Sequence, residues 1–294
     1  MAENNDKQHD VFGVLDAVMP RDMAKRAEYA GTEKAQQNTW TLLALAIMAG
    51  AYVAFGATFA AALTAGLGDG AFAGLGSLLG GLGFSLAFVL AIVGGAELFT
   101  ANVIMIMAWV HGRLSTLWLL RAWALVFIGN FIGAVATGFL LVLAGRHMLS
   151  GGAVGEALLM ASARIENHTL FEGLLLGVLG NTLLCLGVWL TYSARTTTDR
   201  ILALTPPVVA FYALGLEHAV AVMFYLPVAY FIEWLAQPAF WEAITMTTEG
   251  GPPLAAMLRV LPAVTLGNIL GGGVLVGFMY WFVYLQPEKW IDRK

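Results

Sequence analysis

Two acidic residues and one histidine stand where ionisable side chains are rare. Glu97 lies within the segment 94–100 (GGAELFT), and Glu217 and His218 lie within 214–218 (LGLEH), each inside a long apolar stretch. An ionisable residue at membrane depth usually marks a polar pathway through the protein. Histidine can exchange a proton or carry charge near neutral pH. These residue types therefore predict a site that handles a small charged solute inside a membrane.

The stretches that contain these residues are too long for one straight membrane span. Residues 70–112 contain Glu97 as their only charge, and residues 201–232 contain only Glu217. Because roughly 20 residues cross a bilayer, both stretches are predicted to be broken helices. The freed backbone amides and helix ends at such breaks can face a solute at the membrane midplane.

The composition predicts an all-α integral membrane protein. The chain is 59% hydrophobic and 12% charged, with a mean hydropathy of +0.77, which excludes an ordinary soluble domain. The uncharged stretches are long and lack strict apolar and polar alternation, so helices are favoured over an outer-membrane barrel. Six transmembrane helices are expected, the second and fifth broken, at 40–66, 71–110, 122–145, 170–194, 201–235 and 260–285.

Basic residues predict the orientation and the domain boundaries. With the N-terminus inside, 12 lysines and arginines fall in inner segments and three, Arg146, Arg164 and Arg259, in outer loops; basic loops stay cytoplasmic. We expect a cytoplasmic amphipathic segment at 1–38, a channel domain at 39–286 and a cytoplasmic tail at 287–294. The N-terminal segment is too charged for a signal peptide, and 11–35 is expected to form one or two helices broken at Pro20. The single cysteine, Cys185, is expected to be a packing residue.

The chain repeats itself weakly. A Gly-Asn element with GxxxG spacing begins at Gly129-Asn130 and again at Gly267-Asn268, each after one of the predicted broken helices. Three spans per half predict an inverted 3+3 repeat over about 39–145 and 169–286, with a pseudo-twofold axis in the membrane plane. The glycines are expected to allow close helix packing. For Asn130, Asn181 and Asn268, helix-to-helix bonding and pore lining both stay open.

Several motifs together resemble the formate/nitrite transporter family. They are 95–100 (GAELFT), 181–189 (NTLLCLGVW), 215–218 (GLEH) and 264–268 (VTLGN), and their order and spacing agree over about 19–285. Segments 192–195 (YSAR), 206–209 (PPVV) and 281–285 (WFVYL) look most like the formate channel branch. Phe88, Asn102 and Val222 depart from that branch, which usually has a smaller aliphatic residue at the first position and asparagine at the third.

The resemblance implies an aquaporin-like fold, a homopentamer with lipid or a plug on its fivefold axis, and one pore through each protomer. His218 would lie at the centre of the pore between two apolar constrictions, with Thr100 as its hydroxyl partner. Asn181 and Asn268 would surround the same chamber. The family handles conjugate bases of weak acids, so coupling to protons is a hypothesis that rests on His218.

Apolar and charged residues complete the predicted pathway. Phe84 and Phe88 are four residues apart on one helix face; Phe84 with Phe211 is expected to form the outer constriction. Phe88 with Leu98, beside Phe99, is expected to form the inner one. Glu97 and Glu217 are expected to hold loop amides and basic groups near the breaks. Lys34 and His168 are expected in the vestibules, where a cation raises the local anion concentration.

The function predicted from the sequence is a channel or transporter for small monovalent anions in a bacterial inner membrane, with formate as the first candidate. Nitrite, hydrosulfide, lactate and acetate are the alternatives. No HExxH or GxSxG motif and no second intramembrane histidine occurs, so neither an enzyme nor a metal site is expected. No cofactor and no nucleic-acid partner are expected. The partners would be the anion, protons and membrane lipid.

Overall fold

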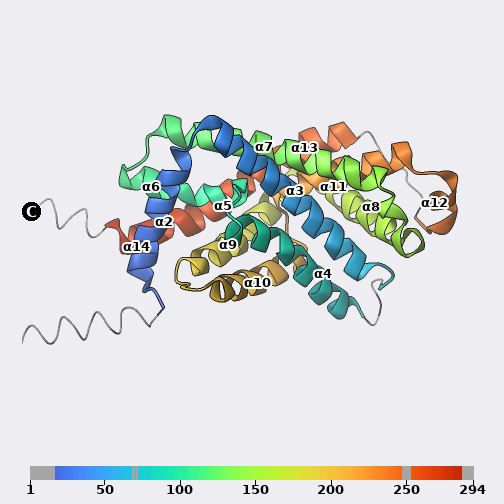
Figure 1. The fold of residues 1–294 in the computed structure, drawn as a ribbon, viewed down its shortest axis with the longest axis horizontal. Coiled ribbons are helices and arrows are strands. Elements are labelled where there is room, and N and C mark those ends of the chain that lie inside the picture. The colour runs from blue at the N-terminus through green and yellow to red at the C-terminus, as the bar shows by residue number, and fades with distance from the viewer. Residues whose placement is uncertain (1–16, 68–69, 71, 247–252, 287–294) are drawn as a thin grey trace, which may run out of the picture.

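The computed structural model describes residues 17–67, 70, 72–246 and 253–286, and within these ranges it is helical without strands (Figure 1). The elements are α2 Pro20–Ala35, α3 Thr39–Thr64, α4 Ala73–Phe88, η1 Val89–Val93, α5 Phe99–Asn102, η2 Val103–Met105, α6 Ile106–His111, α7 Thr116–Leu143, η3 Arg146–Gly152, α8 Ala153–Glu166, α9 Leu170–Thr191, α10 Thr197–Ala213, α11 Ala219–Leu235, α12 Pro238–Ala243, α13 Pro253–Asn268, η4 Ile269–Phe278 and α14 Met279–Tyr284.

Among the described residues, five helices are long and apolar enough to cross a membrane: α3, α4 with η1, α7, α9, and α13 continued through η4 and α14. Phe99–His111 and α11 are shorter apolar helices. Several hydroxyl groups inside these helices are satisfied locally, because they donate to the carbonyl four residues earlier. Examples are Thr58 to Ala54, Ser85 to Gly81 and Thr182 to Val178. The helices therefore present little unsatisfied polarity to lipid.

Both predicted helix breaks are present. The helix formed by α4 and η1 ends at Val93, and α5 begins at Phe99; α10 ends at Ala213, and α11 begins at Ala219. Gly95 and Gly215 adopt φ values of +82° and +61°, in the left-handed region where a Cβ is unfavourable. Each glycine thus lets the chain turn between two half-helices.

The Gly-Asn elements pack closely against the first span of their own half. A Cβ on Gly133 of α7 would overlap the carbonyl oxygen of Ile47 in α3, and a Cβ on Gly271 of η4 would overlap that of Val178 in α9. Small residues allow such backbone contact between helices in lipid. The prediction that the GxxxG glycines serve packing is confirmed.

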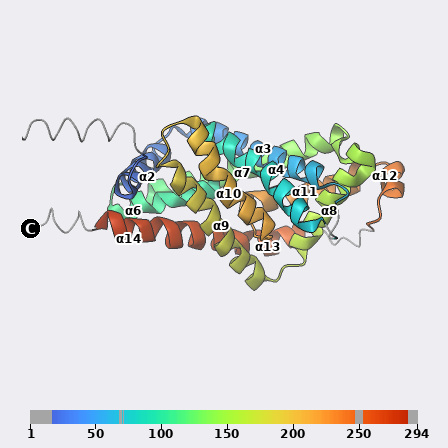
Figure 2. The same ribbon diagram turned by 90° about the horizontal axis from the view of Figure 1, so that it is seen from below.

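The two ends of the molecule carry different elements. Helices α2, α6 and α14 lie together at one end, and α8 and α12 lie at the opposite end, in both Figure 1 and Figure 2. We call these the α2 end and the α8 end. Pro20 is the first residue of α2, so it begins a helix instead of breaking one, as expected where the backbone N–H needs no partner. The predicted helical residues 11–16 and the tail 287–294 lie outside the described residues.

Candidate functional site

Asn130 holds the first break in place. Its Oδ1 accepts the backbone N–H of Phe99 at 2.8 Å, and its Nδ2 donates to the carbonyl oxygens of Ala46 at 2.8 Å and Glu97 at 2.9 Å. The side chain is fully buried. A backbone amide freed by a helix break needs such a partner in an apolar interior. Asn130 therefore joins α3, the break and α7 through three bonds.

Asn268 makes the same three bonds at the second break. Its Oδ1 accepts the backbone N–H of Ala219 at 2.8 Å, and its Nδ2 donates to the carbonyl oxygens of Gly177 at 2.8 Å and Glu217 at 3.1 Å. Both asparagines follow the helix-bonding alternative. Asn268 is also a predicted pore residue, and its side-chain amide makes three hydrogen bonds to backbone groups.

His218 and Thr100 meet between the two half-helix starts. His218 precedes α11, Thr100 lies in α5, and the His218 Nε2 is 2.5 Å from the Thr100 Oγ1. Their exposed fractions are 0% and 1%. This contact joins the two breaks directly, and it is the pairing that the sequence resemblance implied.

The His218 ring also caps α11. Its Nδ1 accepts the backbone N–H of Ala221 at 3.1 Å, as an N-cap side chain does for an otherwise unpaired helix amide. A ring nitrogen that accepts a hydrogen bond carries no proton, so the proton of the neutral ring lies on Nε2. Nε2–H then donates to the Thr100 oxygen, which leaves the Thr100 hydroxyl hydrogen available for another acceptor.

Three phenylalanine rings surround the His218 ring edge to face. The ring centroid of Phe88 lies 5.6 Å from that of His218, and the centroids of Phe211 and Phe84 lie 6.3 Å and 6.5 Å away. Phe84 and Phe211 stack on each other with centroids 5.9 Å apart. We call Phe84, Phe88 and Phe211 the ring cluster. The imidazole thus has one polar neighbour at Nε2, the Thr100 hydroxyl, and apolar rings around it.

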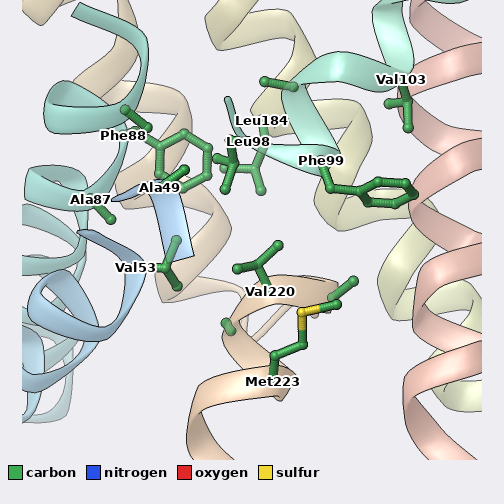
Figure 3. Close-up of a cluster of buried hydrophobic side chains, with 14 of the residues drawn as sticks. Ala49, Val53, Ala87, Phe88, Leu98, Phe99, Val103, Leu184, Val220 and Met223 are labelled. Atoms are coloured by element: carbon green, nitrogen blue, oxygen red, sulfur yellow. The ribbon is translucent and has the colours of Figure 1, made fainter. Parts of the chain in front are cut away.

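The side chains of Leu98 and Phe99, which are neighbours at the start of α5, point in different directions. Figure 3 shows the Phe88 ring pointing toward Leu98, as the predicted inner constriction requires, whereas Phe99 points away from both. The ring of Phe99 packs 5.2 Å from that of Phe127 and 6.2 Å from that of Trp123, both in α7. Phe99 therefore anchors the break to α7 and does not join the predicted constriction.

Asn181 lies beside the contact between His218 and Thr100, and its side-chain oxygen is a free acceptor. Its Nδ2 donates to the carbonyl oxygens of Thr100 at 3.0 Å and Asn268 at 2.8 Å. Its Oδ1 is buried and has no hydrogen-bond partner among the described residues. The thiol of Cys185 also donates to the Thr100 carbonyl, at 3.2 Å. Asn181 thus both holds the backbone of α5 and keeps an oxygen that can accept a donor.

At the α2 end, Glu97 is paired with a base. The Lys34 Nζ lies 3.1 Å from Glu97 Oε2, and Asn102 Nδ2 donates to the same oxygen at 2.8 Å. All three residues line a cavity of about 310 Å³, together with Arg200 and Tyr192. Glu97 is 2% exposed, so Lys34 supplies the pairing that a buried carboxylate requires. Glu97 and Lys34 thus form an ion pair beside the first break.

At the α8 end, Glu217 is paired with two bases. His168 Nε2 lies 3.1 Å and Arg164 Nη2 lies 3.7 Å from Glu217 Oε1. The carboxylate side chain is 3% exposed, whereas those of His168 and Arg164 are 14% and 54% exposed. Glu217 thus lies beside two basic side chains at the second break.

Three features of the site were missed from the sequence. Asn102 was noted only as a departure, although its spacing of five residues from Glu97 brings its amide to the carboxylate across the break. Arg164 was counted only as an outer-loop charge. No sequence signal marked the contact of the Phe88 ring with His218, because it depends on how two helices approach each other. Among the described residues, no group of three His, Cys, Asp or Glu side chains could hold a metal ion.

Comparisons with known proteins agree on one family. The sequence profile described as formate/nitrite transporter matches residues 21–282. The chain is 38% identical over 277 residues to the formate channel FocA of Escherichia coli strain K12, covering 93% of this chain and 97% of that protein. It is 34% identical over 280 residues to FocA of Haemophilus influenzae, covering 94% and 96%. A solved structure described as a pentameric formate channel with formate bound is similar with a TM-score of 0.75 at 35% identity, covering 84% of this chain and 98% of that one.

Proposed function

Because the chain belongs to the formate/nitrite transporter family, we propose that it is a membrane channel for small monovalent anions and that formate is its main substrate. The observation that carries this proposal is the buried contact between His218 and Thr100 at the meeting point of the two breaks. The proposal describes a transporter, since the relatives named above are channels and not enzymes.

The surroundings of His218 suit an anion that sheds water briefly. Moving a bare ion into an apolar interior costs far more free energy than moving a neutral acid. The ring cluster and Leu98 supply apolar walls, which favour a neutral or weakly hydrated species. The Thr100 hydroxyl, whose oxygen already accepts from His218, supplies a donor for a carboxylate oxygen. The surroundings of His218 thus combine the polar contact with Thr100 and apolar side chains.

The geometry also bears on proton coupling. In the described arrangement His218 has no second proton to give, because its Nδ1 accepts from the Ala221 amide. To act as an acid toward formate, the ring would first have to bind a proton at Nδ1 and release this cap. We therefore propose that the Thr100 hydroxyl, whose oxygen accepts from His218, is the hydrogen-bond donor that binds the passing anion. Proton transfer then needs a second ring position in which the cap is open.

Orientation and assembly follow as parts of the same proposal. The α2 end would face the cytoplasm, with both termini inside, and the cavity at Lys34 and Glu97 would be the cytoplasmic vestibule. The matching bonds of Asn130 and Asn268 support an inverted repeat of three spans, as in an aquaporin-like fold. The solved relative described as a pentameric formate channel supports a homopentamer. One pore in each protomer, with lipid or a plug on the fivefold axis, is part of the same proposal.

Other small anions are the second candidates. Nitrite and hydrosulfide each carry one negative charge and contain no more heavy atoms than formate. They would use the same hydrogen-bond donor. Lactate and acetate are larger, and the ring of Phe88, 5.6 Å from the His218 ring, leaves less room for a methyl group. We therefore rank nitrite and hydrosulfide above lactate and acetate as alternatives to formate.

The test is anion flux in proteoliposomes of the purified full chain, with formate, nitrite, hydrosulfide and lactate compared side by side. Protein-free liposomes subtract the diffusion of neutral acids. The expected result is saturable formate flux, slower lactate flux, and a large loss of formate flux in His218→Asn. Equal flux of all four anions would contradict the formate assignment. Absence of any flux from a correctly assembled protein would contradict the channel itself.

A further inference from the structure

Helix α4 packs between α3 and α10 and meets both of them through glycines. A Cβ on Gly83 would lie 2.9 Å from the Cα of Ala60 in α3. A Cβ on Gly81 would lie 2.8 Å from the Cα of Val209 in α10. Because such short contacts leave no room for a side chain, the backbone of α4 is held on two sides along the turn that precedes Phe84.

Tyr212, in the last turn of α10, lies against a third glycine of α4. A Cβ on Gly80 would overlap Cε1 of the Tyr212 ring and lie 2.8 Å from its hydroxyl oxygen. The hydroxyl forms a hydrogen bond with the side chain of Thr64, the last residue of α3. The Thr64 hydroxyl itself donates to the Ala60 carbonyl oxygen at 2.9 Å, so Tyr212 is the donor in this bond. Tyr212 thus ties α10 to α3 across α4.

The Tyr212 ring lies beside Phe84, which is one helical turn beyond Gly80 on α4. The centroids of the two rings are 6.1 Å apart, with 40° between the ring planes. Phe84 also packs against Phe211 at 5.9 Å and Phe88 at 6.0 Å. The common rotamers of an aromatic residue in a helix point toward the preceding turn, which here is the turn of Gly80. The Tyr212 ring therefore occupies space into which the Phe84 ring would otherwise move.

We propose that Tyr212 is a positioning residue that holds Phe84 against Phe211 and thereby limits the size of the anion that passes them. This inference rests on the proposed anion channel, with the stack of Phe84 and Phe211 as its predicted outer constriction. The two stacked rings are 1% and 4% exposed, so an anion passes between them only when a ring moves aside. Tyr212 limits how far Phe84 moves, and the bond to Thr64 keeps the Tyr212 ring in place. Formate needs a small displacement, whereas acetate and lactate need a larger one.

This role predicts a change in selectivity and not a general loss of flux. Tyr212→Val leaves empty space beside Phe84, so acetate and lactate flux should rise while formate flux changes little. Because one methyl group in a fitted site is worth a factor of about 10 to 200, the lactate-to-formate flux ratio should rise about tenfold or more. Tyr212→Phe keeps the ring and removes the bond to Thr64. Its ratio should rise about two- to tenfold, the factor that corresponds to the net contribution of one hydrogen bond.

The experiment measures initial uptake of formate, acetate and lactate at neutral pH into proteoliposomes of the purified full chain. Protein-free liposomes subtract the diffusion of the neutral acids. Thr64→Val removes the acceptor of the same bond, so Thr64→Val, Tyr212→Phe and the double variant should all show the same raised ratio. Thr58→Val is the matched control, because the Thr58 hydroxyl lies in the same helix and donates to the Ala54 carbonyl within that helix; it should keep the parental ratio.

A parental ratio in Tyr212→Val or in Thr64→Val would overturn this inference while leaving the channel intact. An equal loss of all three fluxes in Tyr212→Val would also overturn it, because that is the result of a purely structural role. Effects of Tyr212→Phe and Thr64→Val that add in the double variant would overturn the bond between these residues as the restraint. Gel filtration and the formate KM of each variant establish that it assembles and binds formate like the parent. No saturable formate uptake by the parent would overturn the proposed function, and this inference with it.

Discussion

Replacing Thr100 by valine tests whether the hydroxyl beside His218 is needed for flux. Valine keeps the branched shape and removes the oxygen that lies 2.5 Å from Nε2. Both residues are buried, with exposed fractions of 1% and 0%. The Thr100 hydroxyl is the donor proposed for the anion, and a hydrogen bond to a charged group contributes about 1.5–3 kcal/mol. If the anion binds through this hydroxyl, formate flux should fall about 10- to 150-fold, since 1.4 kcal/mol is tenfold.

The assay is initial formate flux per assembled protein in proteoliposomes, with thermal midpoints in detergent as a check on folding. Thr100→Ser is the matched control, because serine keeps the hydroxyl and loses only a methyl group. We expect serine to retain most of the flux and valine to lose most of it at a similar thermal midpoint. Parental flux in Thr100→Val, or an equal loss in both variants, would refute a role for the hydroxyl.

Two further predictions concern stability. Asn130→Leu and Asn268→Leu should lower the free energy of unfolding by similar amounts, about 3 kcal/mol each. Each substitution leaves one buried backbone N–H at a break without its acceptor and removes two hydrogen bonds to backbone carbonyls. Denaturant midpoints in detergent measure this, and a neutral effect of either substitution would contradict the equivalent roles of the two asparagines. Glu156 of α8 has a pKa below its usual range, chiefly because the Thr245 hydroxyl donates to it, so its stabilisation is present at neutral pH and is lost as pH falls through the lowered pKa. The protection factor of the Thr245 amide, which is its exchange rate relative to the intrinsic rate at the same pH, should therefore fall on acidification in the parent. In Glu156→Gln the protection factor should be low at both pH values; a parental profile in this variant would contradict the assignment.

The sequence predicts the breaks and the close helix pairs because both depend on local composition. A lone charge in an overlong apolar stretch, with glycine beside it, leaves few alternatives to a break near Gly95 or Gly215. GxxxG spacing similarly fixes which face of α7 approaches α3. The pairing of Thr100 with His218 came from the resemblance to a family, since these residues are more than a hundred positions apart and no periodicity relates them.

The ring cluster and Phe99 show where sequence reasoning stops. Phe84 and Phe88 lie on one uninterrupted helix, so their spacing of four residues places both on the same face, and both rings contact His218. Phe99 follows a break, where the rotation of the next helix is no longer set by the preceding one. Its ring points to Phe127 of α7. Arg164 was not predicted for a related reason. It lies near the end of α8, in the connection between α7 and α9, and the path of that connection decides which carboxylate Arg164 reaches.

The two helix breaks share the same backbone support but carry different side chains, which fits the proposal that one histidine serves the whole pathway. Asn130 and Asn268 make equivalent bonds. Counting from Glu97 and Glu217, however, Leu98 holds the position in the first repeat that His218 holds in the second, and Val220 holds the position that corresponds to Thr100. A second histidine in place of Leu98 would bring two titratable rings together in an apolar interior, where like charges cost far more than in water. With one polar pair and apolar counterparts, both half-helix starts are held equally, and in the proposed pathway the anion would meet a single polar contact.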